Sequence, residues 1–170
     1  VFATQNPTGA SGTQLLPDSQ MDRFTVRMSI GYPAPEDERN MVLNRQNGNP
    51  LELVRQVVTR GELVSMQDQA AAVYMKEALV DYVVALVGAT RDHPLIARGA
   101  SPRATLSVTA MAKAAAFIQG RDYVVPKDVQ AVFVSTVAHR LLMTPESEAR
   151  GATAELVLED ILKSTPSPRI

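Results

Sequence analysis

The chain has 170 residues, of which 45% are apolar and 21% are charged, a composition typical of a folded globular protein rather than of a disordered one. Lys and Arg number 17 and Asp and Glu 18, so the net charge of −1 counts against a general nucleic-acid binder, which needs a basic surface. Without cysteine and with only two histidines, the chain has no disulfide scaffold, thiolate metal site, cysteine nucleophile or multi-histidine metal site.

The first 32 residues are predicted to hold two strands. Val1 to Thr4 is a short apolar run, and turn-forming residues from Asn6 to Gly12 follow it. Residues 16–21 are expected to form one or two helical turns. From Phe24 to Ile30 apolar and polar residues alternate, which predicts a strand with one buried face. Because two strands alone do not make a stable sheet, we interpret them as the trailing edge of an α/β domain whose other strands are absent.

Beyond the Pro-rich hinge at residues 31–35, the apolar pattern changes to the period of helices. The best-defined helix covers residues 101–118, with Ser101 as a candidate N-cap, Pro102 at the first helical position and Gly120 just beyond the end. Residues 93–99 are predicted to be a loop. The other predicted helices begin after Pro35 and cover residues 63–72, 76–90, 126–141 and 153–162.

Three polar side chains are candidates for binding an anion. Asn6 follows a predicted strand, where ligands of open α/β sheets bind, although a turn asparagine that bonds to local backbone is the alternative. Arg23 could reach an anion on another subunit, or could form a surface ion pair with Asp22 or another neighbour. Arg103 lies in the first turn of the 101–118 helix, where the helix dipole disfavours a cation. Either a bound anion or a partner carboxylate would relieve this repulsion.

Several expected features of nucleotide, metal or membrane proteins are missing from the sequence. No Gly-x-x-x-x-Gly-Lys-Ser/Thr loop is present, so the main phosphate-binding residues of any nucleotide site would lie in a missing part. His93 and His139 have no metal-like companions, and we expect structural roles for both. No apolar stretch is long enough to span a bilayer and no secretory signal is visible, so we expect a cytoplasmic protein. The start at Val1 rather than Met leads us to expect a fragment without its N-terminal part.

A set of short motifs resembles the second half of a MoxR-type AAA+ ATPase module. They follow one another in the family's order over roughly residues 1–142, which makes the combination specific although single motifs are weak. Two positions depart from the family's pattern: Asp18-Ser19 replaces the usual Glu-Ala, and Arg98 stands where an apolar residue is common. The motifs are Ala3–Pro7, Gly12–Thr13, Leu16–Phe24, Tyr32–Pro33, Ala89–Pro94, Gly99–Ala104, Gly120–Val124, Asp128–Val129 and His139–Leu141.

The resemblance implies a fold and three site residues. The chain would be mainly α, a C-terminal helical lid bundle preceded by the last two strands of a truncated α/β P-loop domain. Residues 1–32 would be the core remnant, 33–163 the lid and 164–170 a disordered tail. By the same resemblance, Asn6 matches sensor 1, which positions the attacking water. Arg23 matches the arginine finger supplied to the neighbouring subunit, and Arg103 matches sensor 2, which contacts phosphates in its own subunit.

The resemblance also implies an activity and partners. The intact protein would hydrolyse Mg-ATP as a homo-hexamer and do chaperone-like or regulatory work with von Willebrand factor A-domain proteins. ATP and Mg would be bound mostly by the missing N-terminal part, so we expect the fragment alone to be inactive, and we expect no nucleic-acid or membrane partner. Two other interpretations stay open. One is a helical adaptor with no nucleotide role, and the other a DNA-directed AAA+ protein, which the neutral charge disfavours.

Overall fold

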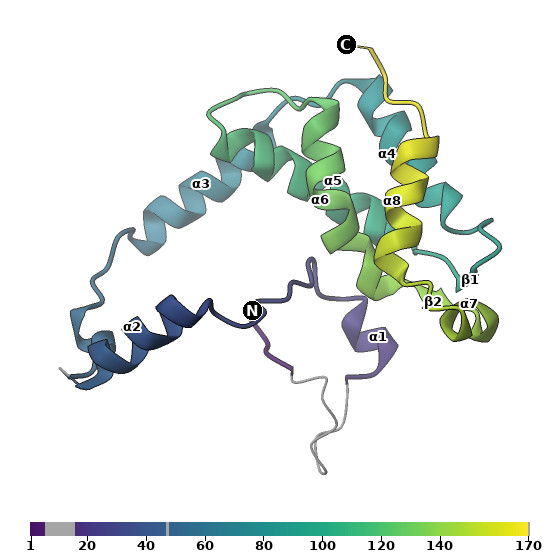
Figure 1. Cartoon of the computed structure of the whole chain (residues 1–170). Helices are drawn as coiled ribbons and strands as arrows, with labels where there is room; N and C mark the ends of the chain where they lie inside the picture. Colours follow the sequence, from purple (N-terminus) through teal and green to yellow (C-terminus); the bar gives the residue numbers. More distant parts are fainter. Residues whose placement is uncertain (6–15, 47, 170) are drawn as a thin grey trace. The chain divides into compact units, whose positions relative to one another are not determined.

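The computed structural model describes residues 1–5, 16–46 and 48–169 (Figure 1). These residues are mainly helical, as the sequence predicts. Their contacts divide the chain into a larger unit, made of residues 1–27 and 70–170, and a smaller unit of residues 28–69. The assignment of residues 1–32, 33–163 and 164–170 to a core remnant, a lid and a tail stays a prediction.

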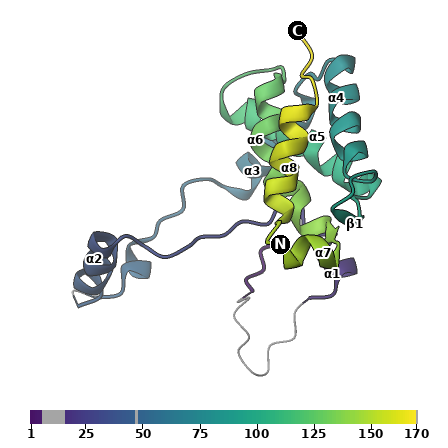
Figure 2. The ribbon, with the colours of Figure 1, turned by 45° about the vertical axis from the view of Figure 1, so that its right-hand side comes forward.

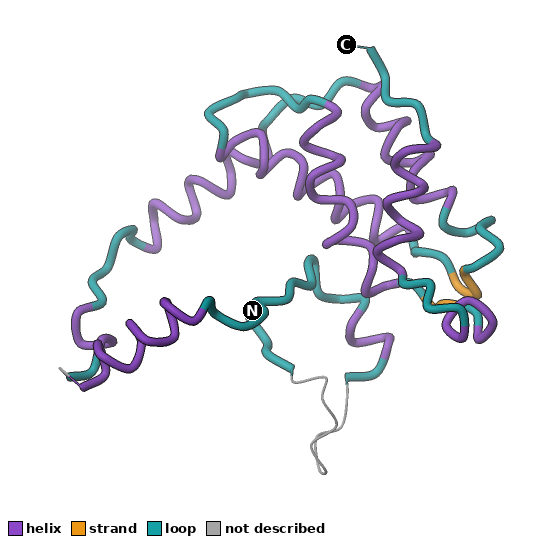
Figure 3. Tube along the Cα trace, in the orientation of Figure 1, coloured by secondary structure: helices purple, strands orange, loops and turns teal. Residues whose placement is uncertain are grey.

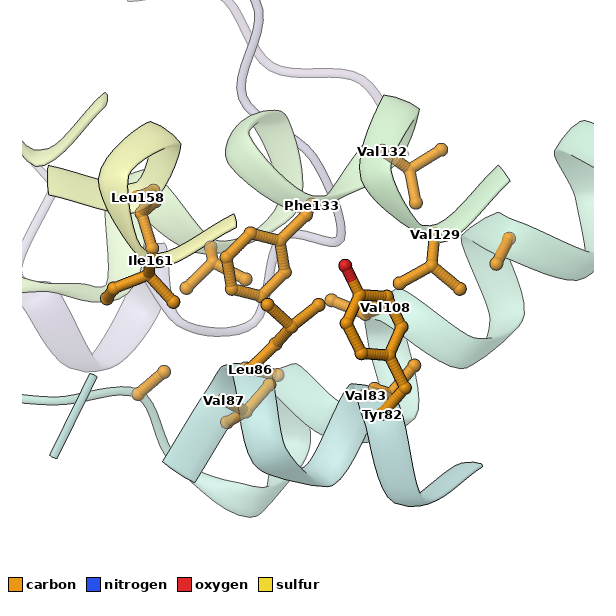
Figure 4. Close-up of a cluster of buried hydrophobic side chains, with 14 of the residues drawn as sticks. Tyr82, Val83, Leu86, Val87, Val108, Val129, Val132, Phe133, Leu158 and Ile161 are labelled. Atoms are coloured by element: carbon orange, nitrogen blue, oxygen red, sulfur yellow. The ribbon is translucent and has the colours of Figure 1, made fainter. Parts of the chain in front are cut away.

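Four helices form the core of the larger unit. They are α4 (Glu77–Ala89), α5 (Pro102–Ile118), α6 (Pro126–Val137) and α8 (Ala154–Ser164). Helix α6 packs against α5 and α8, and α4 contacts the same two helices (Figures 1 and 2). Phe133 of α6 is fully buried and points toward Leu86 of α4 and toward Leu158 and Ile161 of α8 (Figure 4). Burial of these apolar faces is the main stabilising term for the bundle.

The ends of the helices follow local signals in the sequence. Helix α5 begins after Ser101 at its N-cap and has Pro102 at its first position, as predicted. Gly120 follows its C-terminus with a φ of 73°, a left-handed conformation that glycine adopts without strain. The helix predicted over 126–141 is α6 followed by the 3-10 turn η2 (Ala138–Arg140). This turn presents His139 and Arg140 at one end of α5.

The strands predicted at residues 1–4 and 24–30 are not formed, and these residues have no regular secondary structure. A strand needs a neighbouring strand to satisfy its backbone groups, and the described residues offer none beside these segments. Residues 22–27 bind the helices of the larger unit instead. The Arg27 N–H donates to the Ser135 carbonyl at 3.0 Å, and the Arg27 guanidinium lies 2.8 Å from the Glu155 carboxylate.

A short antiparallel ribbon joins a segment predicted to be a loop to the residues that directly follow the helix predicted over 126–141. Strand β1 (Ile96–Arg98) pairs with β2 (Leu142–Met143), with Ile96 opposite Met143 and Arg98 opposite Leu142 (Figure 3). Three and two residues are too few to show alternation, which explains why sequence patterning missed the ribbon. Two short helices complete this unit, α1 (Asp18–Met21) and α7 (Pro145–Ala149).

The smaller unit contains helix α2 (Pro35–Gln46), the 3-10 turn η1 (Pro50–Leu53) and most of α3 (Arg60–Ala72). A capping box starts α3: the Thr59 N–H and hydroxyl donate to Glu62 at 2.6 and 2.8 Å, and the Glu62 N–H donates to the Thr59 hydroxyl at 3.2 Å. None of the described residues in this unit is buried. Across both units, no described helix is long and apolar enough to cross a bilayer.

Candidate functional site

A polar cleft of about 240 Å³ opens where α1, the loop before α5 and the turn η2 meet in the larger unit. Its lining is mostly charged or hydrogen-bonding, which distinguishes it from the apolar core beneath it. Among the side chains that line it are those of Asp22, Ser101 and Arg140. The full lining consists of Asp18, Ser19, Asp22, Arg98, Gly99, Ser101, His139, Arg140 and Leu141.

Three side chains of the helical bundle converge on the carboxylate of Asp22. Arg140 Nη1 lies 3.0 Å from Asp22 Oδ1, and Arg103 Nη1 lies 3.6 Å from Asp22 Oδ2. The hydroxyl of Ser101 donates to Asp22 Oδ1 at 3.3 Å instead of capping its own helix. The sequence leaves open whether a bound anion or a partner carboxylate offsets the repulsion between Arg103 and the helix dipole. In this structure the carboxylate of Asp22 is such a partner.

Arg140 is the most constrained side chain of the cluster. Only 1% of it is exposed, and all three guanidinium nitrogens donate hydrogen bonds. Nε donates to the Thr136 carbonyl at 2.9 Å, Nη1 to the Asp22 carbonyl at 2.9 Å, and Nη2 to the Phe24 carbonyl at 2.8 Å and the Ser107 hydroxyl at 3.0 Å. Burial lowers the pKa of this guanidinium and Asp22 opposes the shift, yet an arginine stays charged at neutral pH. Arg140 thus fixes the backbone on both sides of Arg23.

His139 holds the same stretch of backbone. Its Nε2 lies 3.0 Å from the Phe24 carbonyl, which can only accept, so Nε2 carries the proton. Burial is the main cause that lowers the pKa of His139; the Phe24 hydrogen bond opposes it, and the charges of Arg140 and Arg27 add to it. The imidazole is therefore neutral at pH 7 and serves the structural role that the sequence predicts.

Arg23 lies in the turn after α1, and its side chain is exposed. Its backbone N–H donates to the Gln20 carbonyl at 3.1 Å. Within the described part of the chain, its guanidinium makes no hydrogen bond or ion pair, and Asp22 pairs with other arginines instead. The two neighbours of Arg23 in sequence, Asp22 and Phe24, accept hydrogen bonds from Arg140 through their carbonyls. The backbone at Arg23 is therefore held while its side chain is exposed.

The loop that presents Arg103 is held by a second network, which sequence reasoning did not find. The buried Thr90 hydroxyl accepts from the Ala100 N–H at 3.0 Å and donates to the Val87 carbonyl at 2.7 Å. Arg91 Nε donates to the Ala100 carbonyl at 3.0 Å. The signal that could have revealed it is Gly99, two residues before the N-cap of α5. These bonds fix the direction in which the first turn of α5 points.

Two other positions singled out from the sequence add little to this cluster. Asn6 lies outside the described residues. Arg98 lines the cleft and forms an exposed ion pair with Asp18 at 2.7 Å. In residues 1–5, 16–46 and 48–169, no three His, Asp or Glu side chains come together as a metal site.

Arg103 has the surroundings expected of a residue that binds a phosphate oxygen. It lies in the first turn of the 17-residue helix α5, at the positive end of the helix dipole. In this turn Pro102 has no N–H and the Ala104 N–H donates to the Ser101 carbonyl at 2.9 Å, so the Arg103 side chain is the main group that could hold an anion. That side chain is 52% exposed, and its ionic contact with Asp22 is longer than a hydrogen bond. An exposed cation at this end of a helix suits an anion such as the phosphates of ATP.

Comparisons with known proteins identify the class of this fold. Residues 88–161, which include α5, α6, Arg103 and Arg140, match the family model of the AAA lid domain. A crystal structure of a protein from Cytophaga hutchinsonii that was assigned as an ATPase superposes with a TM-score of 0.90 at 31% identity, over 97% of this chain and 53% of the other. The larger unit therefore contains the lid of an AAA ATPase.

The sequence relatives narrow the class to a family. The chain is 38% identical over its full length to 47% of Chaperone MoxR1 from Mycobacterium tuberculosis, and 30% identical over 99% of its length to 55% of Protein MoxR from Methylorubrum extorquens. It is 32% identical to the protein YeaC of Bacillus subtilis, over 99% of this chain and 52% of that one. The chain belongs to the MoxR family of AAA+ ATPases, and it spans about half the length of the curated relatives it matches.

Proposed function

We propose that this chain is the sensor and lid half of a MoxR-like ATPase whose intact form couples Mg-ATP hydrolysis to remodelling or activation of partner proteins. The observation that carries the proposal is that the segments bearing Arg23 and Arg103 meet at one carboxylate, that of Asp22. The name of the relative Chaperone MoxR1 supports chaperone-like work. By the family resemblance, the intact protein is a cytoplasmic homo-hexamer that acts on von Willebrand factor A-domain proteins.

Arg103 and Arg23 would contact ATP molecules bound by two different subunits. Arg103 would contact the phosphates bound by its own subunit, because its exposed guanidinium lies in the first turn of α5, at the positive end of the helix dipole. Arg23 would contact the nucleotide of the neighbouring subunit, because its side chain is exposed while its backbone is held from both sides. Asn6 would orient the attacking water. Bound Mg-ATP supplies the phosphoryl group, and the arginines neutralise charge that develops during its transfer.

The chain by itself is expected not to hydrolyse ATP or bind it tightly. It lacks the phosphate-binding loop and lysine that hold the β- and γ-phosphates. Sensor and lid residues alone cannot replace that loop. Calorimetric titration of the chain with Mg-ATP should show no binding tighter than millimolar, and a micromolar dissociation constant would contradict this part of the proposal.

A subunit-mixing experiment tests the assignment of Arg23. In the intact protein, Arg23→Ala should spare ATP binding and remove most turnover, because arginine fingers are worth on the order of 10³–10⁵ in rate. Subunits with an inactivated phosphate-binding loop but an intact Arg23 are also inactive. Mixed rings of the two should recover activity, since a good arginine then lies beside a good binding site. No recovery despite proven mixing would show that Arg23 does not act across subunits.

A further inference from the structure

The two arginines that contact Asp22 hold it in different ways. Arg140 is buried, lies 3.0 Å from the carboxylate and has every nitrogen engaged, so its hold on Asp22 is fixed. Arg103 is 52% exposed and lies 3.6 Å away, beyond hydrogen-bond range. An exposed, loose ion pair contributes little to stability and is easily exchanged for another partner. Asp22 thus has one permanent and one exchangeable cation.

Asp22 is also the residue that precedes Arg23 in the chain. The buried Arg140 guanidinium donates hydrogen bonds to the carbonyls of Asp22 and Phe24. The backbone on both sides of Arg23 is therefore held by one side chain. Ser101, one position before helix α5, donates to the same carboxylate at 3.3 Å. A change in the partners of Asp22 therefore acts directly on the peptide that carries the Arg23 side chain.

We propose that Asp22 is a positioning residue that links Arg103 to Arg23, so that the anion held by Arg103 in one subunit sets the placement of the arginine offered to the next. The proposal rests on the proposed function. When Arg103 turns to a phosphate, Asp22 loses its exchangeable cation and stays bound to Arg140 and Ser101. When no phosphate is present, Asp22 retains Arg103 and competes with nucleotide binding. One carboxylate thus serves both arginines.

The decisive variant is Asp22→Asn in the intact protein. The amide oxygen can still accept from Arg140 and Ser101, but without its charge it holds Arg140 less firmly, and it no longer retains Arg103. We expect ATP to bind more tightly, by up to about fivefold, the usual upper value for an exposed ion pair. We expect kcat to fall about tenfold, because misplacing a catalytic group by about 1 Å costs up to about 10²-fold. Tighter binding together with slower turnover is a signature that loss of structure does not produce.

A matched control lies outside the cleft, on helix α8. Asp160 is 74% exposed and forms an ion pair with Lys163 at 3.4 Å. Asp160→Asn removes an equal charge and should leave ATP affinity and kcat unchanged. Hydrogen exchange without nucleotide gives a readout independent of turnover. Backbone amides of residues 20–27 should exchange faster in Asp22→Asn than in the wild-type protein or in Asp160→Asn.

A double-mutant cycle isolates the contact with Arg103. In an Arg103→Ala background, Asp22→Asn should no longer change ATP affinity, because the competing cation is gone. If Asp22→Asn proves too unstable to study, Ser101→Ala removes one donor to the same carboxylate without removing charge. It should also speed exchange of residues 20–27 and lower kcat.

The outcomes separate this inference from the proposed function. If Arg23→Ala removes turnover but Asp22→Asn matches Asp160→Asn in affinity, kcat and exchange, Asp22 does not link the arginines and the inference is wrong. A loss of both affinity and turnover in Asp22→Asn would assign it a purely structural role, which also overturns the inference. If instead Arg23→Ala hydrolyses ATP at the wild-type rate, the proposed function itself fails.

Discussion

Gly99 lies so close to Arg91 that a Cβ on the glycine would be 2.6 Å from the Arg91 Cα. The same atom would lie 2.6 Å from the Thr90 carbonyl oxygen. Both neighbours are backbone atoms, which cannot move aside as the end of a side chain can. The close approach lets Thr90 and Arg91 bind the Ala100 backbone and so fix the entry into α5.

Gly99→Ala should therefore destabilise the protein by about 1–3 kcal/mol, the usual cost of overpacking a tight site. Gly88 is the matched control, because it lies in helix α4 with nothing within 4 Å of an added Cβ. Gly88→Ala should raise the free energy of unfolding by about 0.5–1 kcal/mol, since alanine favours a helix more than glycine does. Urea denaturation measures both. Equal stability of the two variants would show that the backbone at residue 99 relaxes freely.

Arg103→Ala should weaken ATP binding to the intact protein by about 10–100-fold, which corresponds to the loss of one charge-assisted contact. The residue is half-exposed and makes one loose ion pair, so the fold does not depend on it. Arg98→Ala, which removes a cation from the preceding strand, is the control and should leave affinity unchanged. Calorimetric titration with Mg-ATP measures the affinity of both variants. Wild-type affinity in Arg103→Ala would make this arginine only a partner of Asp22.

Asp128 gives the larger unit a predictable response to acid. It is 2% exposed, binds Arg121 through both oxygens at 2.6 and 2.8 Å, and accepts from the Val125 N–H at 2.8 Å. Burial alone would raise the pKa of Asp128, but the Arg121 and Val125 hydrogen bonds outweigh it and hold the pKa below its ordinary 3.8. The stability that this carboxylate contributes is present above the unfolded pKa and is lost as the pH falls through the folded one.

Asp128→Asn should thus lower the free energy of unfolding at pH 7 by about 1.5–3 kcal/mol, as expected for hydrogen bonds to a charged group. The difference from the wild-type protein should shrink as the pH falls below about 4, the ordinary range of an aspartate. Asp160→Asn, at a 74% exposed position on α8, is the control and should change little at either pH. Denaturation at pH 7, 5 and 3 tests this, and a gap that stayed constant across pH would contradict it.

The parts of the fold that sequence predicts are those set by neighbouring residues. Helix α5 is correct to within a residue because Ser101, Pro102 and Gly120 mark its ends locally. Its buried face is not marked in the same way. Ile118 is apolar but 82% exposed, because the bundle buries the face that carries Ala112 and Ala116. Which face is buried depends on the neighbouring helices, and no local pattern contains that information.

The sequence predicts two residues of the candidate site, but not the contacts that join the segments on which they lie. Arg23 and Arg103 were singled out from their places beside a predicted strand and in a helix's first turn, and their catalytic roles remain predictions. The role of Arg140 was missed because its bonds to Asp22 and Phe24 span 118 and 116 positions of sequence. The prediction of a strand from Phe24 to Ile30 was wrong for the same reason, because it too depended on residues far away in the sequence. Alternation indicates that one face is buried, but it does not identify the element that covers that face.

The long sequence separation between Asp22 and Arg140 also orders events on the ribosome. At a synthesis rate of about 5–20 residues per second, Arg140 is made about 6–24 s after Asp22. Helices form within microseconds, so α5 can be helical well before Arg140 has been synthesised. Residues 22–24 are consequently among the last parts of the larger unit to be secured, and a chain released before residue 140 carries both arginines without the guanidinium that joins them.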